Sequence, residues 1–243
     1  IQTTAFISNQ IMGAIAYPSF FPILDKFYRA EYGEDYMQRF ETDELMKYKD
    51  RIIADGKGLF FNFVSDPFLP ETICVNLTCL EMAVTNDVPC VVLTKQANWF
   101  GAFMQSMFMC GLYGKMKQMV KFGFTLTGCD ELEHGNSTNA DRIALMKKLH
   151  EEGFKTWASI EPVIDVDKSL SMIAAAAPFC DEFKVGLLSG KKNYSKADVC
   201  RMILETIHVL RLGDKIQYKE SVYRYIKDIL PNISEAGRIT GRK

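Results

Sequence analysis

Polar and charged residues directly follow several short apolar runs in this sequence. In folds whose parallel strands alternate with helices, functional groups gather at the carboxyl ends of the strands, because the loops there can vary without disturbing the core. A carboxylate, an ammonium group and hydroxyls that converge there could hold a small zwitterionic or ribose-bearing ligand through charge-assisted hydrogen bonds. The candidates for such a site are Ser65, Asp66, Lys95, Thr125, Thr127 and Glu161.

Each candidate also has a structural interpretation. Asp66 is followed by proline and could form a turn, Lys95 could be a solvated charge, and Thr125 and Thr127 are ordinary strand formers. Glu161 ends a run of apolar and small residues and is followed by proline. An acid at a buried strand end needs a partner, so its functional interpretation is the harder one to set aside.

Five apolar runs recur at the spacing of one strand and one helix. They start at residues 59, 90, 122, 156 and 182, so that 31, 32, 34 and 26 residues separate their starts. A segment of that length holds a crossover helix, which makes the next strand parallel to the last. The pattern therefore predicts an α/β fold, either an open doubly wound sheet or a full or partial barrel. The runs cover residues 59–64, 90–93, 122–126, 156–160 and 182–187.

The segments between the runs carry helix signals. Thr138 followed by Asp141 resembles an N-terminal cap, and Gly153 supplies a stop before the next strand. Residues 1–57 are interpreted as a loop followed by one or two helices, and further helices are expected near the end of the chain. The predicted segments are 1–57, an N-terminal loop and helical part, 58–192, the barrel-like part, and 193–243, a C-terminal helical extension.

Composition narrows the class of protein. The 243 residues are 48% hydrophobic and 24% charged, as in ordinary globular domains, and the net charge of −1 gives no overall field that favours nucleic acid or membranes. A nucleic-acid partner would need a local basic patch. No apolar run approaches the roughly 20 residues that span a bilayer. Seven cysteines without a CxxC spacing favour reduced thiols and argue against a zinc site, so we expect a cytoplasmic protein that does not bind membranes.

The same residues carry a family resemblance. The segment GLFFNFVSDPFLPET (58–72) resembles the second barrel strand of spore-photoproduct-lyase-like members of the radical S-adenosylmethionine (SAM) superfamily, and VPCVVLTKQ (88–96) resembles their third strand. FGFTLTGCDELEHGNSTNADRIALMKKLHEEGFKTWASIEPVID (122–165) is similar to the fourth strand, an acidic loop, an arginine-bearing helix and a strand ending in Ile-Glu-Pro. FCDEFKVGLLSG (179–190) resembles the sixth strand. The resemblance lies in the ordered series and covers roughly residues 58–190.

This resemblance implies a partial (β/α)6 TIM-like barrel with C-terminal helices. It also implies a [4Fe-4S] cluster held by three cysteines, SAM bound at the open iron, an external electron donor, and a radical that takes hydrogen from an unknown substrate. The residues that it places around SAM are Ser65 and Asp66 near the methionine amino group, Lys95, Thr125 and Thr127 near the carboxylate or ribose, Glu161 near the ribose or reaction centre, and Gly186 and Leu187 against adenine.

The cluster motif of that family, CxxxCxxC, is absent. Residues 1–73 contain no cysteine, and Cys74 and Cys79 follow the second strand at the wrong spacing. We expect the cluster loop and the first strand to be missing from this chain, which begins without methionine. Two alternatives stay open: an α/β module that binds a nucleotide or SAM without a cluster, and a barrel enzyme that uses Asp66, Lys95 and Glu161 in acid–base or Schiff-base chemistry.

Overall fold

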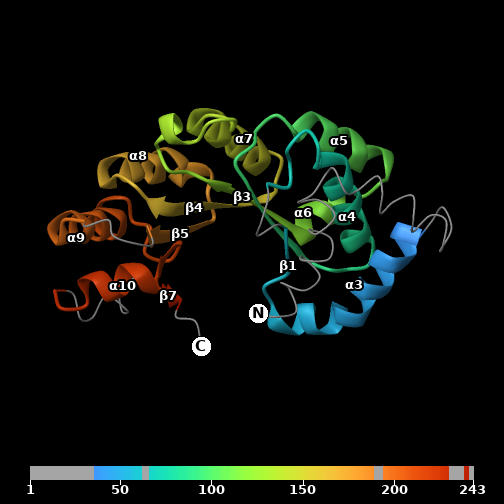
Figure 1. Ribbon diagram of the computed structural model, residues 1–243, viewed down its shortest axis with the longest axis horizontal. Helices are drawn as coiled ribbons and strands as arrows, with labels where there is room; N and C mark the ends of the chain where they lie inside the picture. Colours follow the sequence, from blue (N-terminus) through green and yellow to red (C-terminus); the bar gives the residue numbers. More distant parts are fainter. Residues whose placement is uncertain (1–35, 62–65, 189–193, 230–237, 241–243) are drawn as a thin grey trace. The chain divides into compact units, whose positions relative to one another are not determined.

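Strands and helices alternate along the chain, as the computed structural model shows for residues 36–61, 66–188, 194–229 and 238–240 (Figure 1). The strand pairs described below are parallel, so the predicted α/β class is confirmed. The chain divides into two compact units, Ile1–Lys121 (unit 1) and Phe122–Lys243 (unit 2). Within the four described ranges, no helix combines the length and apolar character needed to cross a membrane.

Unit 1 contains a parallel strand pair and its crossover helix. β1 (Leu59–Phe61) pairs with β2 (Cys90–Thr94), and α4 (Ile73–Thr85) connects them. Gly58 has a φ of +75°, and a Cβ there would lie 2.8 Å from the Pro89 carbonyl oxygen, so a glycine is needed where β1 begins beside β2. The other helices are α3 (Tyr36–Asp55), α5 (Phe100–Met109) and α6 (Tyr113–Met119).

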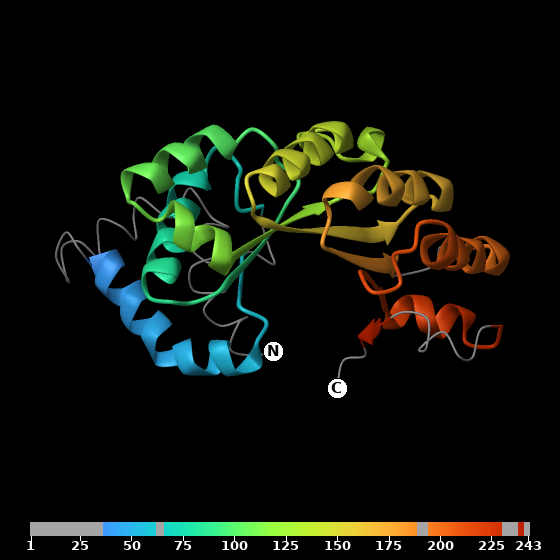
Figure 2. The same ribbon diagram turned by 180° about the vertical axis from the view of Figure 1, so that it is seen from behind.

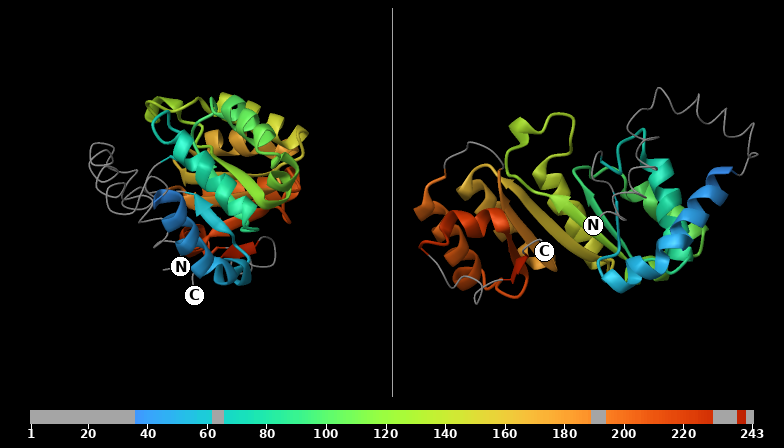
Figure 3. Two further views of the ribbon diagram at one scale, coloured as in Figure 1. Left: turned by 90° about the vertical axis from the view of Figure 1, so that its right-hand side faces the viewer. Right: turned by 60° about the horizontal axis from the view of Figure 1, so that its bottom comes forward.

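Unit 2 continues the alternation with strands that lie in sequence order, joined by parallel pairings from β4 to β7. The right-hand view of Figure 3 shows two of them, β4 and β5, side by side. The prediction of helices alone after residue 193 is wrong, because β6 and β7 lie in this segment. Strands of four and three residues are too short to show the period of two that identifies a strand in a sequence. The strands are β3 (Val120–Thr125), β4 (Lys155–Val163), β5 (Glu182–Leu187), β6 (Ile216–Lys219) and β7 (Arg238–Thr240).

Three of the described helices of unit 2 begin at side-chain caps. The Thr138 hydroxyl accepts a hydrogen bond from the Asp141 backbone N–H at 3.1 Å, which confirms the predicted cap, and Asp165 accepts from the Lys168 N–H in the same way. Figure 2 shows α7, α8 and α9 along one side of β4 and β5. The helices are α7 (Asn139–Glu151), α8 (Val166–Ala176), α9 (Lys196–Leu204), which a π-helical turn (Glu205–Val209) follows, and α10 (Glu220–Ile226).

The central strands of unit 2 have one apolar and one polar face. The register aligns Ile160, Val185 and Tyr218, which are buried, and the Tyr218 hydroxyl is hydrogen-bonded to Thr206 in the π-helical turn. The helices therefore cover this face. Successive residues of a strand point to opposite faces, so the neighbouring rows form the other face. We call these residues the polar face: Trp157, Ser159, Glu161, Glu182, Lys184, Gly186, Gln217 and Lys219.

Candidate functional site

Asp66 is the best-connected candidate in unit 1, and its partners are groups of the chain itself. Its Oδ1 accepts hydrogen bonds from the Phe68 N–H at 3.0 Å and from the Thr94 hydroxyl at 2.6 Å, and its Oδ2 accepts from the Lys95 N–H at 2.5 Å. The carboxylate thus ties the turn after β1 to the end of β2. Asp66 and Lys95 lie close together, as expected for residues at the ends of neighbouring strands, but it is the backbone N–H of Lys95 that contacts the carboxylate. Ser65 lies outside the described residues.

Thr127 holds the turn that follows β3 in unit 2. Its hydroxyl donates to Glu133 Oε2 at 3.0 Å and accepts from the Cys129 N–H at 3.2 Å. The Thr127 N–H donates to Asn139 Oδ1 at 3.0 Å. Because the hydroxyl proton is already donated within the chain, the side chain of Thr127 shapes the loop and has no proton left to donate to a ligand.

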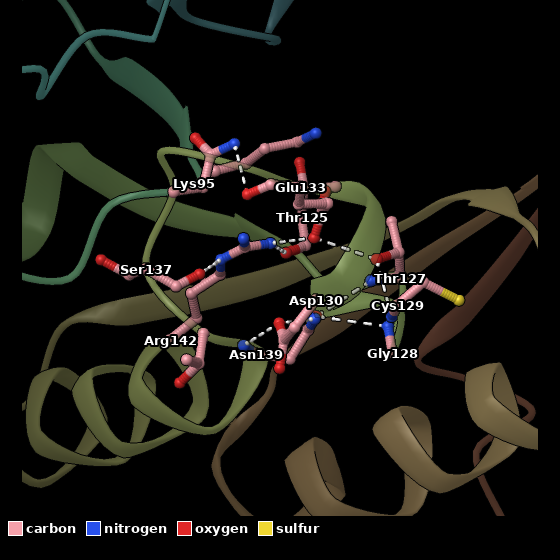
Figure 4. Close-up of polar contacts among 12 residues, drawn as sticks. Lys95, Thr125, Thr127, Gly128, Cys129, Asp130, Glu133, Ser137, Asn139 and Arg142 are labelled. Atoms are coloured by element: carbon pink, nitrogen blue, oxygen red, sulfur yellow. Dashed lines mark hydrogen bonds and ion pairs between the residues drawn. The ribbon is translucent and has the colours of Figure 1, made fainter.

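A buried ion pair fixes the same loop (Figure 4). Arg142 Nη1 lies 2.9 Å from Glu133 Oε2, and the two side chains are 0% and 5% exposed. Nη1 also donates to the Thr125 carbonyl at 2.8 Å, and Nε donates to the Ser137 carbonyl at 2.9 Å. In the described part of the chain, Arg142 Nη2 is buried without a hydrogen-bond partner. A charge buried to this degree requires its partner, so the pair joins α7 to the end of β3.

Further contacts hold the acidic part of this loop. Asp130 Oδ1 accepts hydrogen bonds from both the backbone N–H and the side-chain amide of Asn139. Lys168 Nζ, from α8, lies 2.6 Å from Glu131 Oε1. This contact lowers the pKa of Glu131 and raises the pKa of Lys168 from their ordinary values. The acidic loop that the family resemblance singled out is therefore anchored by α7 and α8.

Glu161 and Lys219 form one of two ion pairs on the polar face. Lys219 Nζ lies 2.5 Å from Glu161 Oε2, and the side chains are 50% and 22% exposed, respectively. The Ser159 hydroxyl lies 3.3 Å from the same oxygen. Glu161 Oε1 is buried and has no hydrogen-bond partner in the described ranges. Glu161 therefore has the partner that a buried acid requires, supplied by a residue that the sequence did not indicate.

Gly186 makes room for the Glu161 carboxyl. A Cβ at this position would overlap Glu161 Oε1, so any other residue would displace the carboxyl group. The neighbouring Leu187 N–H donates to the Ser221 hydroxyl at 3.1 Å. The structure thus brings Glu161, Gly186 and Leu187 together at the ends of β4 and β5, as the strand-end rule requires.

An aromatic ring also lies on the polar face, in the row that pairs Trp157 with Glu182. Lys184 Nζ lies 4.7 Å from the centre of the Trp157 ring, at the distance of a cation–π contact, and 3.6 Å from Glu182 Oε1. The indole lies against Gly123 so closely that a Cβ at that glycine would overlap it. The sequence did not single out Trp157 or Lys184. Only pairing of the strands shows that they share a face with Glu161.

The residues of this chain do not fit an iron–sulfur cluster. All seven cysteines lie in the described ranges and none forms a disulfide: Cys74 and Cys110 are exposed, Cys200 is partly exposed, and the other four are buried. Within these ranges, no group of three or more His, Cys, Asp or Glu side chains could hold a metal ion. Three thiolates close together are what a cluster with one open iron needs.

Known proteins add nothing to this picture, because no family model, curated protein or solved structure matches the chain. Besides Trp157 and Lys184, sequence reasoning missed Lys219 and Glu133. Lys219 is the last residue of a strand too short to be recognised, whereas Glu133 lies within a loop whose acidic character was visible. A search for a buried arginine's partner in that loop could have found Glu133.

Proposed function

We propose that unit 2 binds SAM on its polar face and that the complete protein is a radical SAM enzyme built on a partial barrel. The main observation that supports this proposal is the polar face itself. Parallel sheets are usually buried on both faces, and their strands are apolar throughout. Here one face of β4, β5 and β6 carries two carboxylates, two ammonium groups and an indole. This is the face that would line the inside of a barrel.

Two features of this face fit an adenosyl ligand. Glu161 Oε1 is a buried acceptor without a partner in the described residues, and the absence of a side chain at Gly186 leaves the space in which this carboxyl group lies. A ribose hydroxyl can donate to such a carboxylate, which Gly186 allows to lie close to the backbone of β5. In this proposal, Glu161 faces the ribose, while Gly186 and Leu187 pack against adenine. Thr125 and Thr127 shape the loop beside them, and Arg142 holds that loop in place.

The [4Fe-4S] cluster finds no ligand set in this chain, so the radical step is attributed to the complete form only. Three further cysteines would have to come from outside residues 1–243. The same cysteine positions fit a second candidate as well as they fit the radical enzyme: a module that binds SAM or a nucleoside without a cluster. The barrel enzyme that relies on Asp66 as a base is less well supported, because the Asp66 carboxylate already accepts three hydrogen bonds.

SAM binding to the purified chain, measured by isothermal titration calorimetry, tests the proposal. We expect saturable binding with one site. Gly186→Ala, which displaces the Glu161 carboxyl, and Glu161→Gln, which keeps its shape but removes its charge, should each weaken binding about tenfold. Gly101→Ala is the matched control, since a Cβ at that helical position meets nothing within 4 Å. Absence of SAM binding, or equal binding by all three variants, would refute the proposal.

Mass spectrometry of the intact natural protein separates the two candidates. A CxxxCxxC segment outside these residues, together with reductive cleavage of SAM to 5′-deoxyadenosine after anaerobic reconstitution, would identify the radical enzyme. An intact protein that binds SAM but has no such segment and does not cleave SAM would be the binding module.

A further inference from the structure

The ion pair of the polar face reaches across a strand. Glu161 lies in β4 and Lys219 at the end of β6, with β5 between them. The residue of β5 between them is Gly186, which has no side chain, and this gap lets the two charged groups meet at 2.5 Å. Three successive strands therefore contribute to one arrangement: an acceptor, a gap and a donor.

Stability does not account for this arrangement. An ion pair whose lysine is half exposed contributes little to folding, because water screens the charges and ordering the long side chain loses entropy. Glycine within a strand weakens it. The buried Glu161 Oε1 lacks a hydrogen bond within the described chain, which is itself unfavourable. Apolar residues in this row would stabilise the sheet more than the residues present.

The carboxyl group can present its oxygens to a ligand at small cost. The terminal torsion of a glutamate is broad and roughly two-fold, so rotation exchanges Oε1 and Oε2. Lys219 has three N–H donors, and the contact with Glu161 uses one of them. A ligand at this position would meet a carboxylate acceptor and an ammonium donor side by side.

The chemistry of this pair selects a particular kind of group. The pair has no net charge, so it does not favour a ligand of either sign. A hydroxyl both donates and accepts, and two adjacent hydroxyls can donate to the carboxylate while accepting from the ammonium group. We propose that Glu161 and Lys219 form a subsite for a vicinal diol, in which Lys219 contacts the ligand. The proposal rests on the proposed function in taking the polar face as the ligand-binding side.

A vicinal diol could come from the ribose of an adenosyl ligand or from a sugar-like substrate. Three probes distinguish these sources in titrations of the full chain: adenosine, 2′-deoxyadenosine and methyl β-D-ribofuranoside. We expect the wild type to bind adenosine about tenfold more tightly than 2′-deoxyadenosine, the value of one hydrogen bond to a charged group. Lys219→Met should abolish this preference, and Lys219→Arg should retain most of it. The matched control is Lys196→Met, which removes a surface pair with Asp228 and should change nothing.

Each outcome decides the proposal. A preference that survives in Lys219→Met, or failure of all three probes to bind, would overturn the subsite. Binding of SAM with equal affinity by Lys219→Met, without any preference for the 2′-hydroxyl, would overturn the subsite but leave SAM binding intact. Lys219-dependent binding of the ribofuranoside without binding of adenosine or SAM would support the subsite and assign it to a sugar-like substrate, against the proposed function. Circular dichroism of each variant verifies that it is folded.

Discussion

Replacing Arg142 with methionine tests whether the buried ion pair holds the loop after β3 in solution. Methionine preserves much of the apolar stem but removes the contact with Glu133 and the hydrogen bonds to the Thr125 and Ser137 carbonyls. Both charged side chains are almost fully buried, so solvent screening does not reduce the effect. Breaking such a pair from one side costs about 3–5 kcal/mol, because the remaining charge stays buried.

Urea unfolding, followed by circular dichroism, measures this loss as a lower midpoint at constant slope. Arg201→Met is the matched control: Arg201 lies 2.7 Å from Asp167 and contacts two other acids, but its side chain is 40% exposed. Its removal should change the free energy of unfolding by less than about 1 kcal/mol. The double variant Arg142→Met/Glu133→Gln should be less destabilised than the sum of the single changes, since it leaves no uncompensated carboxylate. Equal effects of Arg142→Met and Arg201→Met would refute the reasoning.

Three further predictions concern other parts of the structure. Gly123→Ala should lower the free energy of unfolding by about 1–3 kcal/mol, because the added methyl group overlaps Trp157. In urea unfolding, the change in indole fluorescence should then occur at a lower urea concentration than in the wild type. In the native protein, Cys74 should react with a thiol reagent at pH 8 faster than Cys110, since a hydrogen bond to Glu81 raises the pKa of Cys110; equal rates would contradict this contact. Burial raises the pKa of Cys180 from 9.0 to about 12, so its stabilising contribution is complete below pH 9 and lost between pH 9 and 12. Cys180→Ala should remove up to about 1.4 kcal/mol per pH unit of the alkaline decline in stability, and an unchanged decline would exclude this group.

The sequence by itself determined the alternation of strands and helices between residues 58 and 192, but not the strands β6 and β7 that come later. Apolar runs about 30 residues apart require crossover helices, so parallel strands follow from chain connectivity. The run at 182–187 coincides with β5, and those at 90–93 and 122–126 overlap β2 and β3. The helix cap at Thr138 could also be predicted from the sequence, because it depends on residues that are only three positions apart in one turn.

Local sequence could indicate a candidate but could not tell whether its polar group is already used. Asp66 and Thr127 have the chemistry of ligand-binding residues, yet the structure shows their side chains bonded to the chain itself. The two partners differ in how far away they are: Thr94 is 28 positions from Asp66, whereas Glu133 is six positions from Thr127 and reaches it only because the loop folds back.

Only the tertiary structure decided what surrounds Glu161. Its partner Lys219 is 58 residues further along the chain and is the last residue of a strand of four residues, which is too short to show a recognisable period. Strand pairing brings the two together and places Gly186 between them. The physical reason is that the faces of a sheet are set by register between strands, which depends on long-range packing, whereas the sequence of each strand records only its own alternation.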